Sequence, residues 1–246
     1  MVYKQSSPNT LLISQLKMVL KKKVVLNRIE LKVNKGEIFG ITGINGSGKT
    51  VFIKVLATLL RPTEGKVWID EYDIVKDRSQ VRNMIGYMPD STGFDKRLSV
   101  REYLEFFRSM YQRCKREYGL SYEELLNRIG LNQISERLLS NLSRGERQKV
   151  SLIRAVIHNP SLLLLDDPDA GMDPTGIDRL YSLLKELSSK GTTIIVSSHS
   201  IPFLSMVSRR IGIIHSGEFR WILQTGIESI ETIKARIQKL DIGNNE

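Results

Sequence analysis

The chain has 246 residues, of which 41% are hydrophobic and 26% charged, and its formal net charge is +10 at pH 7. This length allows one sizeable core, with or without an inserted subdomain, and the proportions argue against a disordered chain. The longest apolar stretches, such as LLLL at 162–165, are far shorter than the roughly 20 residues of a membrane-spanning helix. The N-terminus lacks the apolar stretch of a secretion signal, and the single cysteine, Cys114, excludes an internal disulfide and suits a reducing cytosol.

The positive charge favours an anionic ligand or partner, such as a phosphate, an anionic lipid surface or nucleic acid, without choosing among them. Basic runs at 21–23 and 113–116 are by themselves typical of solvated faces. Charge alone therefore does not assign a function.

Apolar runs of strand length at 37–42, 161–166 and 192–197 alternate with longer helical patterns. This alternation predicts an α/β fold whose buried parallel sheet is flanked by helices. Between about residues 91 and 158 the pattern is helical only, beginning with capping boxes at Ser99 and Ser121. We predict that this stretch is an inserted helical subdomain.

The segment GINGSGKT, which begins at Gly43 and ends at Thr50, follows the first predicted strand and opens a predicted helix. It matches G-x-x-x-x-G-K-[ST] in full, so its backbone N–H groups are expected to surround a polyphosphate. Lys49 would reach the β- and γ-phosphates, and the Thr50 hydroxyl would bind Mg²⁺. A second metal-side group is expected from Asp166, which ends the leucine-rich strand at the carboxyl edge of the sheet.

The helix that follows should begin with Asp173 as its N-cap and Pro174 at its first position, and should end before Gly191. After the strand at 192–197, a hairpin is expected near 215–218 and a last helix from about Ile227.

Five motifs in order give this chain a resemblance to the ATP-binding cassette (ABC) ATPases, the motor subunits of ABC transporters. They are GINGSGKT, NLSRGERQ at 141–148, LLLLDDP at 162–168, AGMD at 170–173 and SSHS at 197–200. The resemblance implies a single nucleotide-binding domain over 1–246, with a P-loop NTPase (RecA-like) core, the helical insertion at about 91–158 and an N-terminal antiparallel β region. The segment at 86–107 looks most like exporter-type (ABC-2-like) cassettes.

The resemblance also implies ATP and Mg²⁺ as cofactors, and a composite site between two cassettes, identical or different. The signature loop of one cassette closes over the ATP of the other, and an integral membrane permease is the further partner. The chain would then lie in the cytoplasm, peripherally on the cytoplasmic face of the cell membrane. The resemblance and the motif assign ATP binding to Leu20, Gly43, Asn45, Gly46, Ser47, Gly48, Lys49, Thr50 and Val51. They assign the signature and dimer contacts to Ser143, Arg144, Gly145, Glu146 and Asp173. Thr50, Asp90 and Asp166 are expected to bind the metal, and Asp167 and His199 to act in catalysis.

The signature assignment of Ser143 and Glu146 has a structural alternative, and the identity of Asp167 has a consequence for hydrolysis. Ser143 and Glu146 also form a good capping box, which by itself would explain both residues. Asp167 stands where most relatives have a glutamate, and its side chain is about 1.3 Å shorter by ordinary bond geometry. We therefore expect ATP binding to persist and hydrolysis to be slow.

Four other departures from the family matter less than Asp167, and together they concern turnover more than nucleotide binding. Leu20 stands where an aromatic usually stacks on adenine, Asp90 where a glutamine is usual, Val51 where a hydroxyl is frequent, and Glu146 at the last glutamine of the signature. Losing the stacking contact costs roughly 0.5–1.5 kcal/mol.

The function best supported by these patterns is that of an ATPase subunit that powers an ABC transporter, with export as the direction. The alternative is a nucleotide-gated regulatory or nucleic-acid-associated cassette that hydrolyses ATP little, which the charge and Asp167 favour slightly. A basic segment interleaved with aromatics is missing from the sequence, which argues against nucleic acid as a partner.

Overall fold

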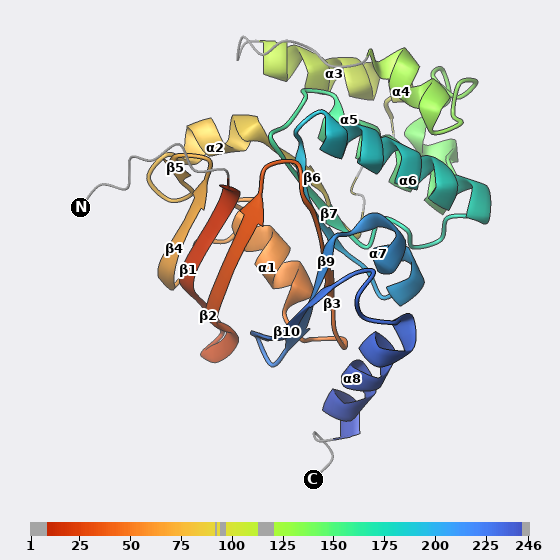
Figure 1. The fold of residues 1–246 in the computed structure, drawn as a ribbon. Coiled ribbons are helices and arrows are strands. Elements are labelled where there is room, and N and C mark those ends of the chain that lie inside the picture. Colours follow the sequence, from red (N-terminus) through yellow and green to blue (C-terminus); the bar gives the residue numbers. More distant parts are fainter. Residues whose placement is uncertain (1–8, 92, 94–96, 113–120, 243–246) are drawn as a thin grey trace.

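The computed structural model describes residues 9–91, 93, 97–112 and 121–242, whose fold is drawn in Figure 1. The basic run at 113–116 and Cys114 lie outside the described residues. Of the helices in the described ranges, none combines the length and apolar composition needed to cross a bilayer.

A four-stranded antiparallel sheet is formed by the N-terminal part of the chain, in the order β2-β1-β4-β5. Lys21 and Lys22 connect its first two strands, and both have positive φ, 47° and 66°, as a two-residue hairpin turn requires. The expected N-terminal antiparallel region is thus confirmed. The strands are β1 (Asn9–Leu20), β2 (Lys23–Asn34), β4 (Glu64–Ile69) and β5 (Tyr72–Asp73).

A six-stranded sheet in the order β10-β9-β3-β8-β7-β6 forms the centre of the fold. All its pairings are parallel except that of β10 with β9. Every residue of β3, β7 and β8 is buried, which explains why these strands read as continuous apolar runs. The strands are β3 (Ile38–Thr42), β6 (Ile85–Met88), β7 (Leu162–Asp166), β8 (Thr193–Ser197), β9 (Arg210–His215) and β10 (Glu218–Gln224).

Two apolar clusters cover the two faces of this central sheet. One lies between it and the N-terminal sheet and includes the buried face of α1, which Figure 1 shows between the two sheets. The other lies on the opposite face and takes in side chains of α3 to α8. The helices are α1 (Lys49–Leu56), α2 (Arg78–Met84), α3 (Val100–Gln112), α4 (Tyr122–Arg128), η1 (Leu139–Asn141), α5 (Arg144–Val156), α6 (Pro174–Ser189), α7 (Ile201–Val207) and α8 (Ile230–Ile242).

Capping boxes start three of the helices, as the sequence predicts. Ser121 and Ser143 each exchange hydrogen bonds with the glutamate three residues on. Ser99 does the same, since its N–H donates to Glu102 Oε2 (2.8 Å) and its Oγ accepts from the Glu102 N–H (3.2 Å). Side chains of α4 and α5 join the same cluster as β7 and β8, so the helical stretch packs directly on the sheet. Its limits as a subdomain remain a prediction.

The C-terminal third follows the predicted order, and only the start of the last helix differs from the prediction. Asp173 is the N-cap residue of α6 and Pro174 its first residue, but the Asp173 side chain makes no capping bond and lies 3.7 Å from Lys149 Nζ. The last helix begins at Ile230 and not near Ile227, because the Ser229 hydroxyl accepts the Thr232 N–H and so caps it. The hairpin at 215–218 joins β9 to β10 as expected.

Candidate functional site

The loop between β3 and α1 has backbone angles that its glycines make possible. Gly43 has a φ of 153°, and a Cβ there would lie 2.2 Å from the carbonyl oxygen of Ile214. Gly48 has a φ of 114° and lies against Leu26 and Val25. Glycine is thus needed both for conformation and for close packing.

The β9–β10 turn holds this loop from the other side. The Gly217 N–H donates to the Ser47 carbonyl (3.0 Å), and the Asn27 N–H donates to the Gly217 carbonyl (2.9 Å). A Cβ at Gly217 would lie 2.3 Å from the Val25 carbonyl oxygen. Strand β2, the turn and the loop therefore form one hydrogen-bonded unit.

Lys49 lies folded across the loop that precedes it. Its Nζ donates to the carbonyl oxygens of Gly43 (2.7 Å) and Ile44 (3.1 Å), and only 6% of the residue is exposed. Burial lowers the pKa of the ammonium, while the charges of Asp167 and Asp166 oppose that shift. The buried Ser47 hydroxyl has no hydrogen-bond partner among the described residues. A bound phosphate would satisfy both groups.

Asp166 ends β7 and is completely buried. Its Oδ1 accepts a hydrogen bond from Ser197 Oγ (2.7 Å), whereas its Oδ2, also buried, has no partner of standard geometry in the described part of the chain. Burial raises the pKa of this carboxyl, the Ser197 and Thr50 hydroxyls lower it, and the charges of Asp167 and Asp90 raise it again.

These residues fit a magnesium ion. An unpartnered buried carboxylate oxygen, a hydroxyl beside it and a second acid at the end of β6 supply the oxygen ligands that Mg²⁺ prefers. No group of three or more His, Cys, Asp or Glu that could hold a metal occurs in the described ranges. Thr50, Asp166 and Asp90 would hold it, and it would neutralise charge on the phosphates.

Asp167 follows in a left-handed conformation, with a φ of 49°. Its N–H donates to Ser197 Oγ (3.0 Å), and its carbonyl accepts from the Gln148 amide (2.8 Å). Both contacts hold the backbone and leave the carboxylate free to turn, with 23% of the side chain exposed. Aspartate is among the few residues that tolerate this conformation well.

His199 lies on the loop after β8, with Nε2 3.8 Å from Asp167 Oδ2 and 52% of its side chain exposed. The neighbouring Ser198 donates to Asp169 Oδ2 (2.9 Å) and accepts the Ser200 N–H (2.9 Å). Burial raises the pKa of Asp169, and the hydrogen bond from Ser198 opposes this shift. The structure thus brings the phosphate loop, the two predicted acids and the histidine to one edge of the sheet.

The predicted signature residues form a second group. Ser143 and Glu146 cap α5, and Arg137 pairs with Glu146 at 2.8 Å, so their hydrogen bonds stay within the helical stretch. Arg144 is exposed, and a Cβ at Gly145 would lie 3.3 Å from the Gly171 carbonyl oxygen.

The remaining predicted residues lie around the first group. Asn45 is exposed on the phosphate loop, and Asp90 is exposed just after β6. Leu20 and Val51 are half-buried and pack against the cluster between the two sheets.

Three residues of the site were missed in the sequence: Ser197, Gln148 and Asp169. Ser197 is opposite Asp166 in the parallel pairing of β7 with β8, so knowledge of strand order would have found it. Gln148 lies one turn into α5 and is 3% exposed, and a buried polar residue in a helix is a signal that sequence reasoning could have used.

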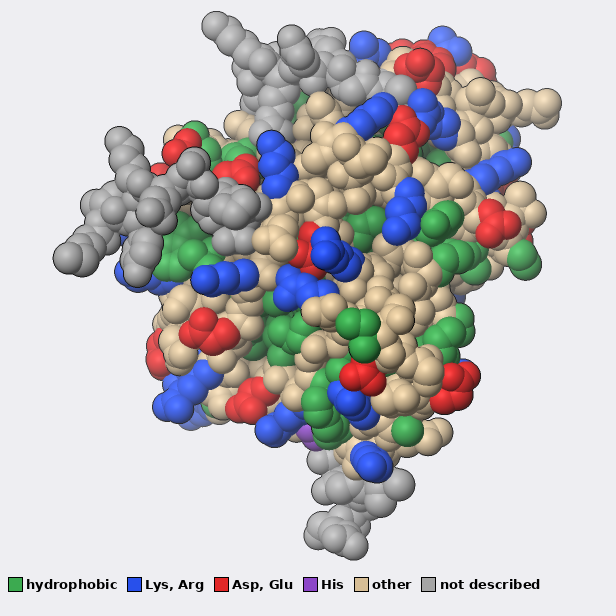
Figure 2. All heavy atoms as spheres, in the orientation of Figure 1, with side chains coloured by type: hydrophobic (Ala, Val, Ile, Leu, Met, Phe, Trp, Pro, Cys, Tyr) green, Lys and Arg blue, Asp and Glu red, His purple; other side chains and the backbone are tan. Residues whose placement is uncertain are grey.

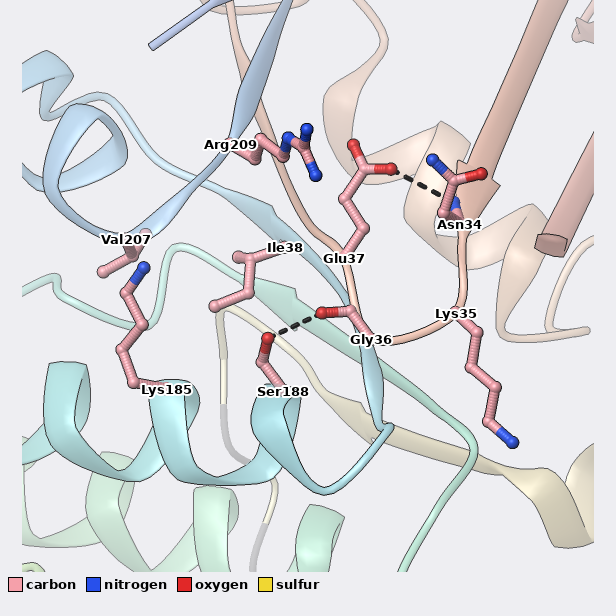
Figure 3. A pocket seen from close by; sticks show the side chains of 9 residues that line it. All are labelled: Asn34, Lys35, Gly36, Glu37, Ile38, Lys185, Ser188, Val207 and Arg209. Atoms are coloured by element: carbon pink, nitrogen blue, oxygen red, sulfur yellow. Dashed lines mark hydrogen bonds between the residues drawn. The ribbon is translucent and has the colours of Figure 1, made fainter. Parts of the chain in front are cut away.

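Two cavities border the central sheet. A cavity of about 670 Å³ lies beside the phosphate loop and is lined by Thr42–Asn45, His199–Pro202 and three residues of α8, Lys234, Ile237 and Gln238. A smaller one of about 240 Å³ lies at the opposite edge, where β3 begins (Figure 3). There Ser188 donates to the Gly36 carbonyl (2.6 Å), and Glu37 accepts from the Asn34 N–H (3.1 Å). Only the first cavity adjoins the candidate site.

A glycine-rich phosphate loop at the carboxyl edge of a parallel sheet, with an acid ending a neighbouring strand, defines a P-loop nucleoside triphosphatase. The ABC transporter family model matches residues 26–170, and the chain belongs to this family. It is 35% identical over 214 residues to the ABC transporter ATP-binding protein NatA of Bacillus subtilis, covering 85% of this chain and 87% of that one. It is 32% identical over 194 residues to the bacitracin transport ATP-binding protein BcrA of Bacillus licheniformis, covering 78% of this chain and 62% of that one.

Solved structures agree in fold. The ATP-binding subunit of an ABC transporter has a TM-score of 0.83 at 24% identity, covering 93% of this chain and 99% of that one. A dimeric ATP-binding cassette in a post-hydrolysis state, bound to ADP and phosphate, has a TM-score of 0.77 at 26% identity, covering 87% and 98%. The family and the fold class predicted from the motifs are confirmed, and the chain is an ATP-binding cassette.

Proposed function

We propose that this cassette is the ATPase subunit of an exporter, and that it works as a dimer attached to a membrane permease at the cytoplasmic face of the membrane. The observation that carries the proposal is the grouping of Lys49, Asp166, Asp167 and His199 at one sheet edge. Among the similar proteins, the bacitracin transport protein BcrA and the daunorubicin resistance protein DrrA3 of Streptomyces coeruleorubidus support export.

In the proposed reaction, Lys49 exchanges its two carbonyl partners for β- and γ-phosphate oxygens. Asp167 orients and polarises the attacking water, because its carboxylate lies beside His199 and is free of the contacts that fix its backbone. His199 contacts the γ-phosphate and holds the water on the attacking side. The short reach of Asp167 makes turnover slow.

The composite site would give the signature residues an anion to bind. Ser143 begins a 13-residue helix whose N-terminal N–H groups favour an anion, and the γ-phosphate of a second cassette would supply one. ATP would then promote the dimer, and hydrolysis would open it. The solved cassette dimer that this chain resembles supports such an assembly.

The alternative is a regulatory or nucleic-acid-associated cassette with little hydrolysis. On the face drawn in Figure 2, Lys and Arg side chains are interspersed with Asp and Glu, an arrangement unlike a continuous basic track. This face therefore does not offer the continuous basic track that a nucleic-acid backbone would need.

The two functions separate in one experiment. The tagged chain is purified from membranes of its own host under mild detergent, and its ATPase rate is measured with and without the proteins that accompany it. A co-purifying multi-spanning membrane protein that changes the rate supports transport. Purification without any membrane protein, together with binding to nucleic acid, would support the alternative.

A further inference from the structure

Tyr87 lies on β6, next to the strand that carries the metal-side acid. It is opposite Leu164 of β7 in the parallel pairing, and both side chains belong to the cluster between the sheets. Successive side chains of a strand alternate between faces, so Asp166, two residues beyond Leu164, points to the same face. A tyrosine side chain that leans along the strand therefore extends toward the carboxyl end where Asp166 lies.

The Tyr87 hydroxyl and Asp166 Oδ2 are complementary groups, and the Thr50 hydroxyl also lies close enough to the Asp166 carboxyl to lower its pKa. Both atoms are buried, and neither has a hydrogen bond of standard geometry within the described residues. The first is a donor and the second an acceptor. Leaving such groups unpaired is costly, and native structures keep them so mainly where a ligand or an ordered water completes the network.

The charges of the metal-side acids also act on the Tyr87 phenol. Burial raises the pKa of Tyr87 to about 12, the charges of Asp166 and Asp90 contribute in the same direction, and the charge of Arg154 opposes them. The hydroxyl consequently keeps its proton at neutral pH and can act as a donor.

Helix α5, which begins at the signature residues, fixes the backbone of Tyr87. Arg154 of α5 donates to the Tyr87 carbonyl (3.1 Å) and to the Tyr103 hydroxyl of α3 (3.0 Å), and its guanidinium lies over the Phe107 ring at 5.4 Å. The Tyr87 ring, which packs on the other face in the cluster between the sheets, therefore projects from a fixed backbone position.

We propose that Tyr87 is a positioning residue for the metal side of the nucleotide site. When Mg·ATP is bound, its hydroxyl donates to the Asp166 carboxylate, directly or through one water, and keeps the carboxylate turned toward the ion. Ser197 already holds the other oxygen, so the two donors together would fix the carboxylate plane. The inference rests on the proposed ATP site.

The test compares Tyr87→Phe with Tyr72→Phe, a half-buried tyrosine of the same cluster on β5. ATP affinity is measured by calorimetry over a range of Mg²⁺ concentrations and also in EDTA, and thermal unfolding is followed without nucleotide. For Tyr87→Phe we expect a roughly 10-fold smaller gain in ATP affinity from Mg²⁺, since losing a group that orients a metal ligand typically costs about 10–100-fold. Affinity in EDTA should not change, and the Tm without nucleotide should be equal or higher, because an unpaired buried hydroxyl has been removed.

An unchanged gain from Mg²⁺ in Tyr87→Phe overturns the inference. So does an equal loss of affinity with and without Mg²⁺, or a fall in Tm without nucleotide, because either result would show that the hydroxyl acts without the metal and not at the metal side of the site. Tyr72→Phe should leave the Mg²⁺ gain unchanged. If the parent chain shows no Mg²⁺-dependent ATP binding, the proposed function fails, and this inference fails as well because it rests on that function.

Discussion

Replacing Asp167 with asparagine is expected to slow ATP hydrolysis about 10²-fold and to leave folding and ATP binding nearly unchanged. The substitution removes the negative charge of the side chain and keeps its shape. Both anchors of this residue, Ser197 Oγ and the Gln148 amide, bond to its backbone, and asparagine tolerates a φ of 49° as well as aspartate does. An amide still accepts a hydrogen bond but polarises water poorly.

The magnitude follows from the reach of the side chain. A positioned acid–base group contributes about 10²- to 10⁴-fold, or roughly 3–5 kcal/mol of transition-state stabilisation. Aspartate is about 1.3 Å shorter than glutamate, and a misplacement near 1 Å costs on the order of 10²-fold, so the lower end of that range applies. Glutamate at this position should raise the rate, but the left-handed backbone disfavours it and should cost about 1–2 kcal/mol of stability.

The assay is phosphate release at saturating Mg·ATP, with ATP affinity measured separately by calorimetry. Parent and variant must be compared with the same membrane partner present or with none. Hydrolysis at the parent rate by Asp167→Asn would show that Asp167 is a structural carboxylate, and the catalytic assignment would have to be abandoned.

Three further variants test the rest of the site. Lys49→Ala should weaken ATP binding sharply, because it removes the side-chain cation from the phosphate loop, whereas Lys54→Ala on the same helix should not; equal affinities in calorimetry would contradict the assignment. Ser143→Arg should abolish ATP-dependent dimerisation in light scattering and leave ATP binding to the monomer intact; a dimer that persists would exclude the composite site. Asp166→Asn should raise the Tm of the nucleotide-free chain at pH 7, because the folded-state pKa of Asp166 is raised above 3.8 and its charge therefore destabilises the fold as pH rises. This gain should shrink as pH falls toward 4, and a gain that is constant with pH would refute the linkage.

The local features of the fold could be predicted from sequence because neighbouring residues determine them. The strands around 37–42, 161–166 and 192–197, and the serine caps at 99, 121 and 143, each depend on a few consecutive side chains. The phosphate loop was recognisable for the same reason. The family resemblance then linked these features in one order.

Contacts between distant segments could not be predicted in this way. Ser197 bonds Asp166 across 31 positions, and Gln148 bonds Asp167 across 19, and both bonds depend on which strands and helices are neighbours. The unpaired hydroxyl of Tyr87 is visible only once β6 is placed beside β7. Asp173 is the N-cap residue of α6 as predicted, but local sequence does not show that its side chain lies toward Lys149 and makes no capping bond.

The bond between Gly217 and Ser47 has a consequence for synthesis of the protein. The phosphate motif is complete once residue 50 has been translated, yet the turn that holds its loop against β2 is made about 170 residues later. A nascent chain that ends before β9 carries the motif without the neighbours that shape it. We expect such a chain to bind nucleotide weakly, so that ATP can stabilise the fold only near the end of translation, when most of the hydrophobic core has already been made.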